Sequence, residues 1–220
     1  MCHPVCHLSG NWARVAIDTY SRYTERFPQR PLLQLSAPGL PVYSSSPNAR
    51  DENLAEFVRL GRSARALGAT HAMIACNTMH LLREKFEADS GLRMLDMVEA
   101  TRQQLPSFRK VGIVATKMSI HHGLYESAKG EWDLVLPTDF EQDELQRIIE
   151  DSKKDISPKP NLRLMTILDA LVDRGAEALV LGCTDFPQLL QQGWRPEAVL
   201  IDPIDHLIEL AGNQTSSRVL

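Results

Sequence analysis

The sequence of 220 residues lacks most of the features that mark broad classes of protein. No apolar run approaches the roughly 18 residues that a membrane-spanning helix requires, so we expect no membrane association. Its 24 basic and 28 acidic residues form no clustered basic stretch, and we therefore expect no nucleic-acid partner. The start, Met1-Cys2-His3-Pro4, lacks the basic and apolar segments of a signal peptide. We therefore predict a cytoplasmic location.

Several catalytic signatures are also missing. The chain contains no Gly-x-Ser-x-Gly elbow, no phosphate loop and no dinucleotide-binding fingerprint. There are only four cysteines, which should remain thiols in the reducing cytosol. Cys2 and Cys6 stand beside His3 and His7, and these are zinc-type ligands. Their spacing is not a usual structural zinc pattern, so we predict no metal site and keep zinc binding as an alternative.

What the chain does contain is an alternation of apolar runs and helical segments. The apolar runs are rich in β-branched residues and are too continuous for strands with one wet face, which predicts parallel strands buried on both sides. We expect an α/β fold. The predicted strands are 32–35, 72–75, 111–115, 134–136, 178–181 and 198–201. The predicted helices are 12–27, 53–67, 78–86, 99–105, 120–128, 141–150 and 162–174.

Two segments, 67–78 and 173–184, follow the same plan. Each has a helix end, a Gly-Ala turn, an apolar strand and then a cysteine that threonine follows within two positions. The cysteines are Cys76 and Cys183. This quasi-repeat predicts two similar αβ lobes, each with one cysteine at the carboxyl end of a strand, where parallel α/β folds bind their ligands.

A pair of thiols in such positions suggests acid–base chemistry. Free backbone N–H groups at a helix start attract anions, and they favour a thiolate over a thiol. A thiolate can remove a proton from one face of a carbon acid while a thiol returns a proton to the other face. We therefore predict that Cys76 and Cys183 are paired catalytic residues that need no cofactor. The plainer alternative is that both are small buried hydrophobic residues.

The segments Ala75-Cys76-Asn77-Thr78-Met79-His80 and Leu181-Gly182-Cys183-Thr184-Asp185-Phe186-Pro187 resemble the paired signatures of the aspartate/glutamate racemase superfamily. The resemblance implies two pseudo-symmetric αβα lobes, each with a short parallel sheet, and an active site in the cleft between them. We expect residues 1–97 plus 200–220 to form the first lobe and residues 98–199 the second. The resemblance also implies a homodimer and cofactor-independent two-base racemisation of an amino acid, a small-molecule substrate.

By the same resemblance, four residues are expected to hold the carboxylate and amino group of the substrate: Asn77, Thr78, Thr116 and Thr184. Asn11, at the opening turn, is a further candidate. Family members that act on aspartate use an arginine and a lysine to neutralise the distal carboxylate. Here those positions align with Tyr43 and Glu144, and an unpaired Glu144 would repel an acidic side chain.

We therefore hypothesise a neutral or basic amino acid as substrate, bound in part by Tyr43 and Glu144. The alternative is an aspartate or glutamate racemase in which Lys117, Arg147 or Lys154 supplies the positive charge. Two further alternatives are an inactive homologue that only binds an amino acid, and a one-sided reaction through a cysteine nucleophile.

Three other side chains have candidate roles near the thiols. His80, one helical turn after Cys76, can orient it, and His206 can project from the C-terminal segment. Asp185 can tune Cys183. For each of these residues, a packing or capping role is an equally good interpretation.

Overall fold

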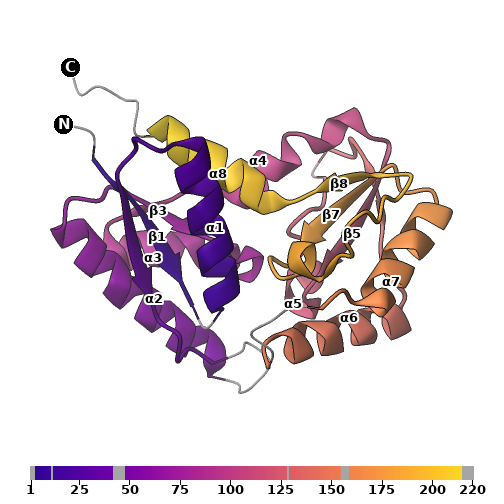
Figure 1. Ribbon diagram of the computed structural model, residues 1–220, viewed down its shortest axis with the longest axis horizontal. Helices are drawn as coiled ribbons and strands as arrows, with labels where there is room; N and C mark the ends of the chain where they lie inside the picture. Colours follow the sequence, from indigo (N-terminus) through magenta and orange to yellow (C-terminus); the bar gives the residue numbers. More distant parts are fainter. Residues whose placement is uncertain (1–2, 11, 42–47, 128, 155–158, 215–220) are drawn as a thin grey trace. The chain divides into compact units, whose positions relative to one another are not determined.

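The computed structural model describes residues 3–10, 12–41, 48–127, 129–154 and 159–214 (Figure 1). The chain forms two compact units: Met1–Met97 with Ile204–Leu220, and Val98–Pro203. Each unit contains one four-stranded sheet, and every strand pairing is parallel. The α/β class predicted from the sequence is thereby confirmed. Asn11 and Tyr43 lie outside the described residues.

The first unit has the strand order β2-β1-β3-β4. Its elements are β1 (Val5–Ser9), α1 (Ala13–Arg26), β2 (Leu32–Ser36), α2 (Ala49–Ala66), β3 (His71–Ile74), the 3-10 helix η1 (Asn77–Leu82), α3 (Arg83–Ser90), β4 (Arg93–Met94) and α8 (Pro203–Gln214).

Helices cover both faces of this first sheet. On one face, Cys6 and Leu8 of β1 belong to an apolar cluster that includes Phe57 of α2 and Phe86 of α3. Because side chains alternate along a strand, His7 points to the opposite face. Helices α1 and α8 lie side by side in this unit (Figure 1), where Arg22 pairs with Asp205 at 2.5 Å. Both faces are therefore covered, as the continuous apolar runs predict.

The second unit has the strand order β6-β5-β7-β8. Its elements are α4 (Met97–Arg102), η2 (Leu105–Ser107), β5 (Lys110–Ala115), α5 (Lys117–His121), β6 (Asp133–Val135), α6 (Asp139–Ser152), α7 (Leu162–Asp173), β7 (Ala178–Gly182), η3 (Phe186–Leu189) and β8 (Val199–Ile201). A complete capping box between Thr138 and Glu141 begins α6, and such a box satisfies two backbone N–H groups at the helix start.

The Gly-Ala turns of the two similar segments have the same structure. Gly68 follows α2 with φ +92°, and Gly175 follows α7 with φ +94°. Ala69 N donates to Ala64 O at 3.0 Å, and Ala176 N donates to Leu171 O at 3.0 Å. Glycine adopts this left-handed conformation without steric cost, so each helix ends abruptly and the next strand starts in the same phase. The cysteine then falls at the same offset from its glycine in both segments.

The C-terminal region differs from the expectation. We expected the chain to return to the first lobe at residue 200, but β8 pairs with β7 in the second sheet, through Val180 and Ile201 among others. Residues up to Pro203 belong to the second unit. The return segment is α8, a helix that our reading of the apolar pattern missed.

Candidate active site

Cys76 follows β3 and stands directly before η1, with an extended backbone (φ −152°, ψ 107°). Its side chain is half-buried and packs against the apolar cluster that α2 and α3 complete. Its carbonyl oxygen accepts the backbone N–H of Met79 at 3.1 Å. Asn77 and Thr78, which follow, are buried. The structure thus brings three of the predicted site residues together at the carboxyl edge of the first sheet.

His80 is buried one turn after Cys76 and is fixed at both ring nitrogens. Nδ1 lies 3.0 Å from the carbonyl oxygen of Cys76, and the backbone N–H of Met97 donates to Nε2 at 3.3 Å. Nε2 also lies 3.3 Å from the carbonyl oxygen of Leu95, so each ring nitrogen has a backbone carbonyl within hydrogen-bond distance. Burial also lowers the pKa of His80. His80 therefore contacts the backbone of Cys76, and the predicted orienting role stays a prediction.

Cys183 directly follows β7 and is buried. Its Sγ lies 3.9 Å from Oδ2 of Asp185, a long contact in which the thiol donates. Its carbonyl oxygen accepts the backbone N–H of Phe186 at 3.1 Å. Thr184 and Asp185 are buried beside it. The helix that follows, η3, has only four residues, so it supplies less of a helix dipole than the sequence suggested.

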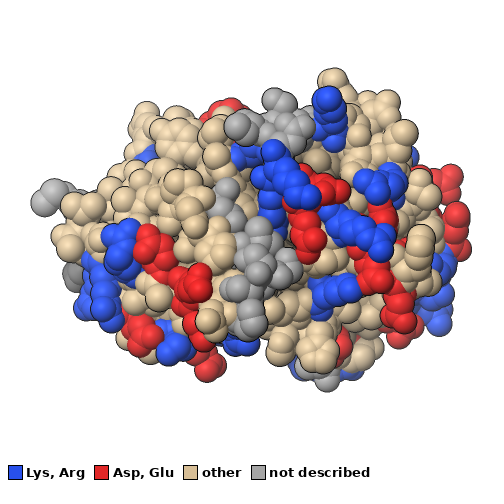
Figure 2. Space-filling model, turned by 90° about the horizontal axis from the view of Figure 1, so that it is seen from below, with Lys and Arg blue, Asp and Glu red and all other residues tan. Residues whose placement is uncertain are grey.

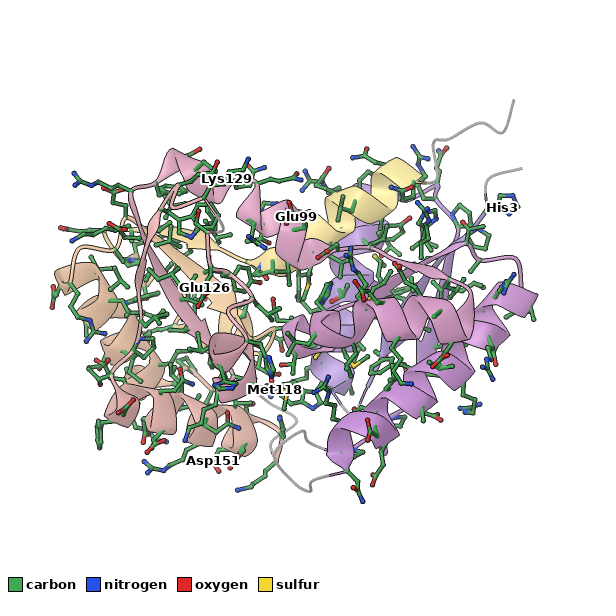
Figure 3. The ribbon with its side chains drawn as sticks, turned by 180° about the vertical axis from the view of Figure 1, so that it is seen from behind. His3, Glu99, Met118, Glu126, Lys129 and Asp151 are labelled. Carbon is green, nitrogen blue, oxygen red and sulfur yellow. The ribbon has the colours of Figure 1, made fainter. Side chains whose placement is uncertain are left out.

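Thr116 lies at the end of β5, the neighbour of β7, because Ala115 pairs with Gly182. Its hydroxyl oxygen accepts the backbone N–H of Ser119 at 3.1 Å and so caps α5. Met118 of this helix is labelled in Figure 3. The Thr-x-x-Ser spacing is a capping signal that our sequence reading did not use.

Gly182 allows β5 and β7 to approach each other closely below Cys183. A Cβ at this position would lie 2.9 Å from Cβ of Ala115, 3.1 Å from the carbonyl oxygen of Val114 and 3.3 Å from the ring of Tyr125. The first distance is shorter than real Cβ contacts allow. A glycine at the end of β7 therefore sets the spacing between Thr116 and Cys183.

Glu144 is not the unpaired carboxylate that the sequence argument assumed. It lies on α6, where Arg147 pairs with it at 2.8 Å, and Arg163 of α7 forms a second, shorter ion pair. Arg147 is one of the three alternative cations, and the other two are also paired, Lys117 with Asp143 and Lys154 with Asp151. The premise of a repulsive Glu144 is wrong, because a cation 19 residues later in the chain neutralises it.

The cysteine–histidine group at the chain start does not converge. Cys6 points into the apolar cluster and His7 to the other face of the sheet. His3, labelled in Figure 3, lies 3.3 Å through Nδ1 from the carbonyl oxygen of Gly68. Cys2 lies outside the described residues. Among those that are described, no three side chains of the His, Cys, Asp and Glu types gather as metal ligands.

The described surface carries mixed charges. On the face in Figure 2, basic and acidic side chains are interspersed and form no single-sign patch. In the described part of the chain, no helix combines the length and the apolar character needed to cross a membrane. His206, the remaining candidate, lies half-buried on α8.

The fold defines a class of protein: two parallel α/β units, each with a cysteine at the carboxyl end of an inner strand of its sheet. The model of the Asp/Glu/Hydantoin racemase family matches residues 17–211. The chain therefore belongs to this family.

The chain is similar in sequence to several racemases. The chain is 30% identical to a glutamate racemase of Desulforudis audaxviator over 62% of its own length and 52% of the relative's. It is 23% identical to the broad specificity amino-acid racemase RacX of Bacillus subtilis, over 68% of the chain and 67% of that protein. The chain spans about half the length of two glutamate racemases that it matches, 52% of one and 46% of the other.

Solved structures share the fold. The crystal structure of an aspartate racemase homologue from Pyrococcus horikoshii matches with a TM-score of 0.74 and 19% identity, covering 98% of this chain and all of that one. A glutamate racemase from Francisella tularensis, in complex with D-glutamate, matches with a TM-score of 0.67 and 16% identity. That match covers 94% of this chain and 78% of the racemase. Both matches confirm the two-lobed α/β architecture.

Proposed function

We propose that this protein is a cofactor-independent amino-acid racemase or epimerase that uses Cys76 and Cys183 as its acid–base pair. The observation that carries the proposal is the matched structural context of the two thiols. Each follows a glycine-terminated helix and a parallel strand, and each stands before a 3-10 helix. Membership of the Asp/Glu/Hydantoin racemase family and the names of its relatives support the reaction class.

The proposed reaction has two proton transfers at the α-carbon. The thiolate of one cysteine removes the α-proton, and the C–H electron pair remains on the substrate as a carbanion. The thiol of the other cysteine then donates its proton to the opposite face, which inverts the configuration. The roles exchange in the reverse direction, so no net proton is gained or lost.

The neighbours of the cysteines suit these roles. The thiol of Cys183 points toward the carboxylate of Asp185, with 3.9 Å between Sγ and Oδ2. For the other cysteine, His80 holds the backbone of Cys76 in place. We assign Asn77, Thr78, Thr116 and Thr184 to the carboxylate and amino group of the substrate, because they lie next to the thiols at the two sheet edges.

The substrate class remains a hypothesis with two forms. A neutral or basic amino acid is the first, although its main support is weaker now that Arg147 and Arg163 neutralise Glu144. An acidic amino acid is the second, and the names of the glutamate racemases among the relatives favour it.

Solvent exchange tests the proposed activity directly. The protein is incubated in D₂O with single L-amino acids of acidic, neutral and basic side-chain types, and deuterium at the α-carbon is followed by NMR. A racemase incorporates deuterium and produces the D-enantiomer. Binding without exchange, for any member of the panel, would support an inactive amino-acid-binding homologue. A covalent adduct on Cys76 would instead support a one-sided nucleophilic reaction.

A homodimer and a cytoplasmic location complete the proposal. Both come from the resemblance and from the composition of the chain. Light scattering of the purified protein, which gives its molar mass in solution, tests the first; fractionation of the source cells tests the second.

A further inference from the structure

The side-chain amide of Gln142, on α6, is held in one orientation by the end of β5. Its Nε2 donates to the carbonyl oxygen of Ala115 at 3.0 Å. A carbonyl oxygen can only accept a hydrogen bond, so the NH₂ group must face Ala115 and the amide oxygen must face away. This contact removes the usual ambiguity between the oxygen and the nitrogen of a glutamine side chain.

The amide oxygen of Gln142 is a buried acceptor. Oε1 is shielded from solvent and receives no hydrogen bond from the residues that the structure describes. Buried polar atoms in native proteins almost always have a partner, because an unsatisfied one is costly. An acceptor that is oriented, buried and unsatisfied fits a donor group that comes from a bound molecule.

The position of Gln142 indicates which molecule this is. Ala115 is the last residue of β5, and Thr116 follows it. Ala115 also pairs with Gly182, which directly precedes Cys183. Gln142 therefore contacts the carboxyl edge of the second sheet at the strand ends that carry two of the proposed site residues. Parallel α/β sheets bind their ligands outside these ends.

We propose that Gln142 is a substrate-binding residue whose Oε1 accepts a hydrogen bond from the α-ammonium group of the amino acid. This inference rests on the proposed function. An ammonium group has only donors, so it complements a fixed acceptor, whereas a substrate carboxylate has only acceptors and would be repelled. The bond to Ala115 fixes the orientation of the amide, and the atoms that shield Oε1 must move aside for the ammonium group to reach it.

Two substitutions separate the two ends of the amide. Gln142→Met has a similar length but lacks both the donor and the acceptor. Gln142→Glu keeps acceptor oxygens, loses the NH₂ group that holds Ala115 and adds a negative charge, which an ammonium group tolerates. We expect the KM of Gln142→Met to rise about tenfold or more, as for the loss of a hydrogen bond to a charged group. We expect the KM of Gln142→Glu to stay within about threefold of the wild-type value, with kcat changing less than KM in the Met variant.

Gln146 supplies the matched control. It lies one turn further along α6, and its Nε2 donates to Glu150 at 3.0 Å, away from the sheet edge. Gln146→Met should leave KM unchanged. The melting temperature of each variant is measured in parallel, and KM is determined by α-deuterium exchange with the L-amino acid that the wild-type protein exchanges fastest.

The outcomes are distinct. A KM for Gln142→Met within twofold of wild type overturns the inference. Equal increases in the Met and Glu variants also overturn it, because Gln142 would then act only through Ala115. If Gln142→Met does not fold, a tenfold rise in the KM of Gln142→Glu is still a refutation. A wild-type protein that exchanges no amino acid refutes the proposed function itself, whereas an active protein with unchanged KM values refutes only the role of Gln142.

Discussion

His7 predicts a specific loss of stability in mild acid. Its ring is fully buried in β1, opposite Gln34 of β2. Burial lowers its pKa from 6.5 to about 4, and a contact with Gln34 offsets only part of that shift. Between these two pH values the unfolded chain binds a proton that the folded chain does not bind. The stabilisation is therefore complete above pH 6.5 and is lost as the pH falls toward 4.

The size of the effect follows from the two pKa values. Between pH 7 and pH 4.5, His7 removes about 2 kcal/mol from the free energy of unfolding. His7→Met does not titrate, so its loss of stability over this interval should be smaller by about that amount. Urea denaturation followed by circular dichroism at both pH values gives the comparison. His80, which burial also affects, is present in both proteins and cancels.

Equal losses in the two proteins, within about 0.5 kcal/mol, would contradict the assignment of this pH dependence to His7. A larger loss in the variant would contradict even its sign.

Three further predictions concern local structure. Gly182→Ala should cost about 1–3 kcal/mol of stability, measured by urea denaturation, because the new Cβ forces β5 and β7 apart. The variant should also exchange the α-proton of the substrate more slowly, and unchanged activity would contradict the role of the glycine. Thr138→Ala removes the capping box of α6 and should cost about 1 kcal/mol by the same method; no loss would mean that the cap is dispensable. Burial raises the pKa of Cys6 to about 12. Iodoacetamide at pH 8 should therefore alkylate the half-buried Cys76 well before Cys6, as measured by mass spectrometry. Equal labelling of the two cysteines would contradict the burial of Cys6.

Local signals in the sequence were sufficient for the fold class. Continuous apolar runs and the repeated Gly-Ala turn predicted parallel strands that end at Cys76 and Cys183, because these features act within a few neighbouring residues. The helix α8 was not predicted from the sequence, although its inner face buries Ile204 and Leu207. The pairing of β8 with β7 was not predicted either, because strand partners depend on contacts between residues distant in sequence.

The charge state of the candidate site depends on tertiary contacts. Glu144 was assigned as unpaired because no sequence pattern connects α6 with Arg163 of α7. The contact of Gln142 with the end of β5 has the same origin, since a single glutamine in a helix carries no signal of its own. The two proposed catalytic cysteines were thus easier to find than the residues proposed to bind the substrate.

Chiral analysis of the products from wild type, Cys76→Ala and Cys183→Ala tests the central claim most directly. Each protein is incubated with the amino acid that the wild type exchanges fastest, starting once from the L- and once from the D-enantiomer. The two-base account predicts racemisation by the wild type and its loss in each single variant, with both variants still folded. Racemisation at the wild-type rate by either variant would contradict it.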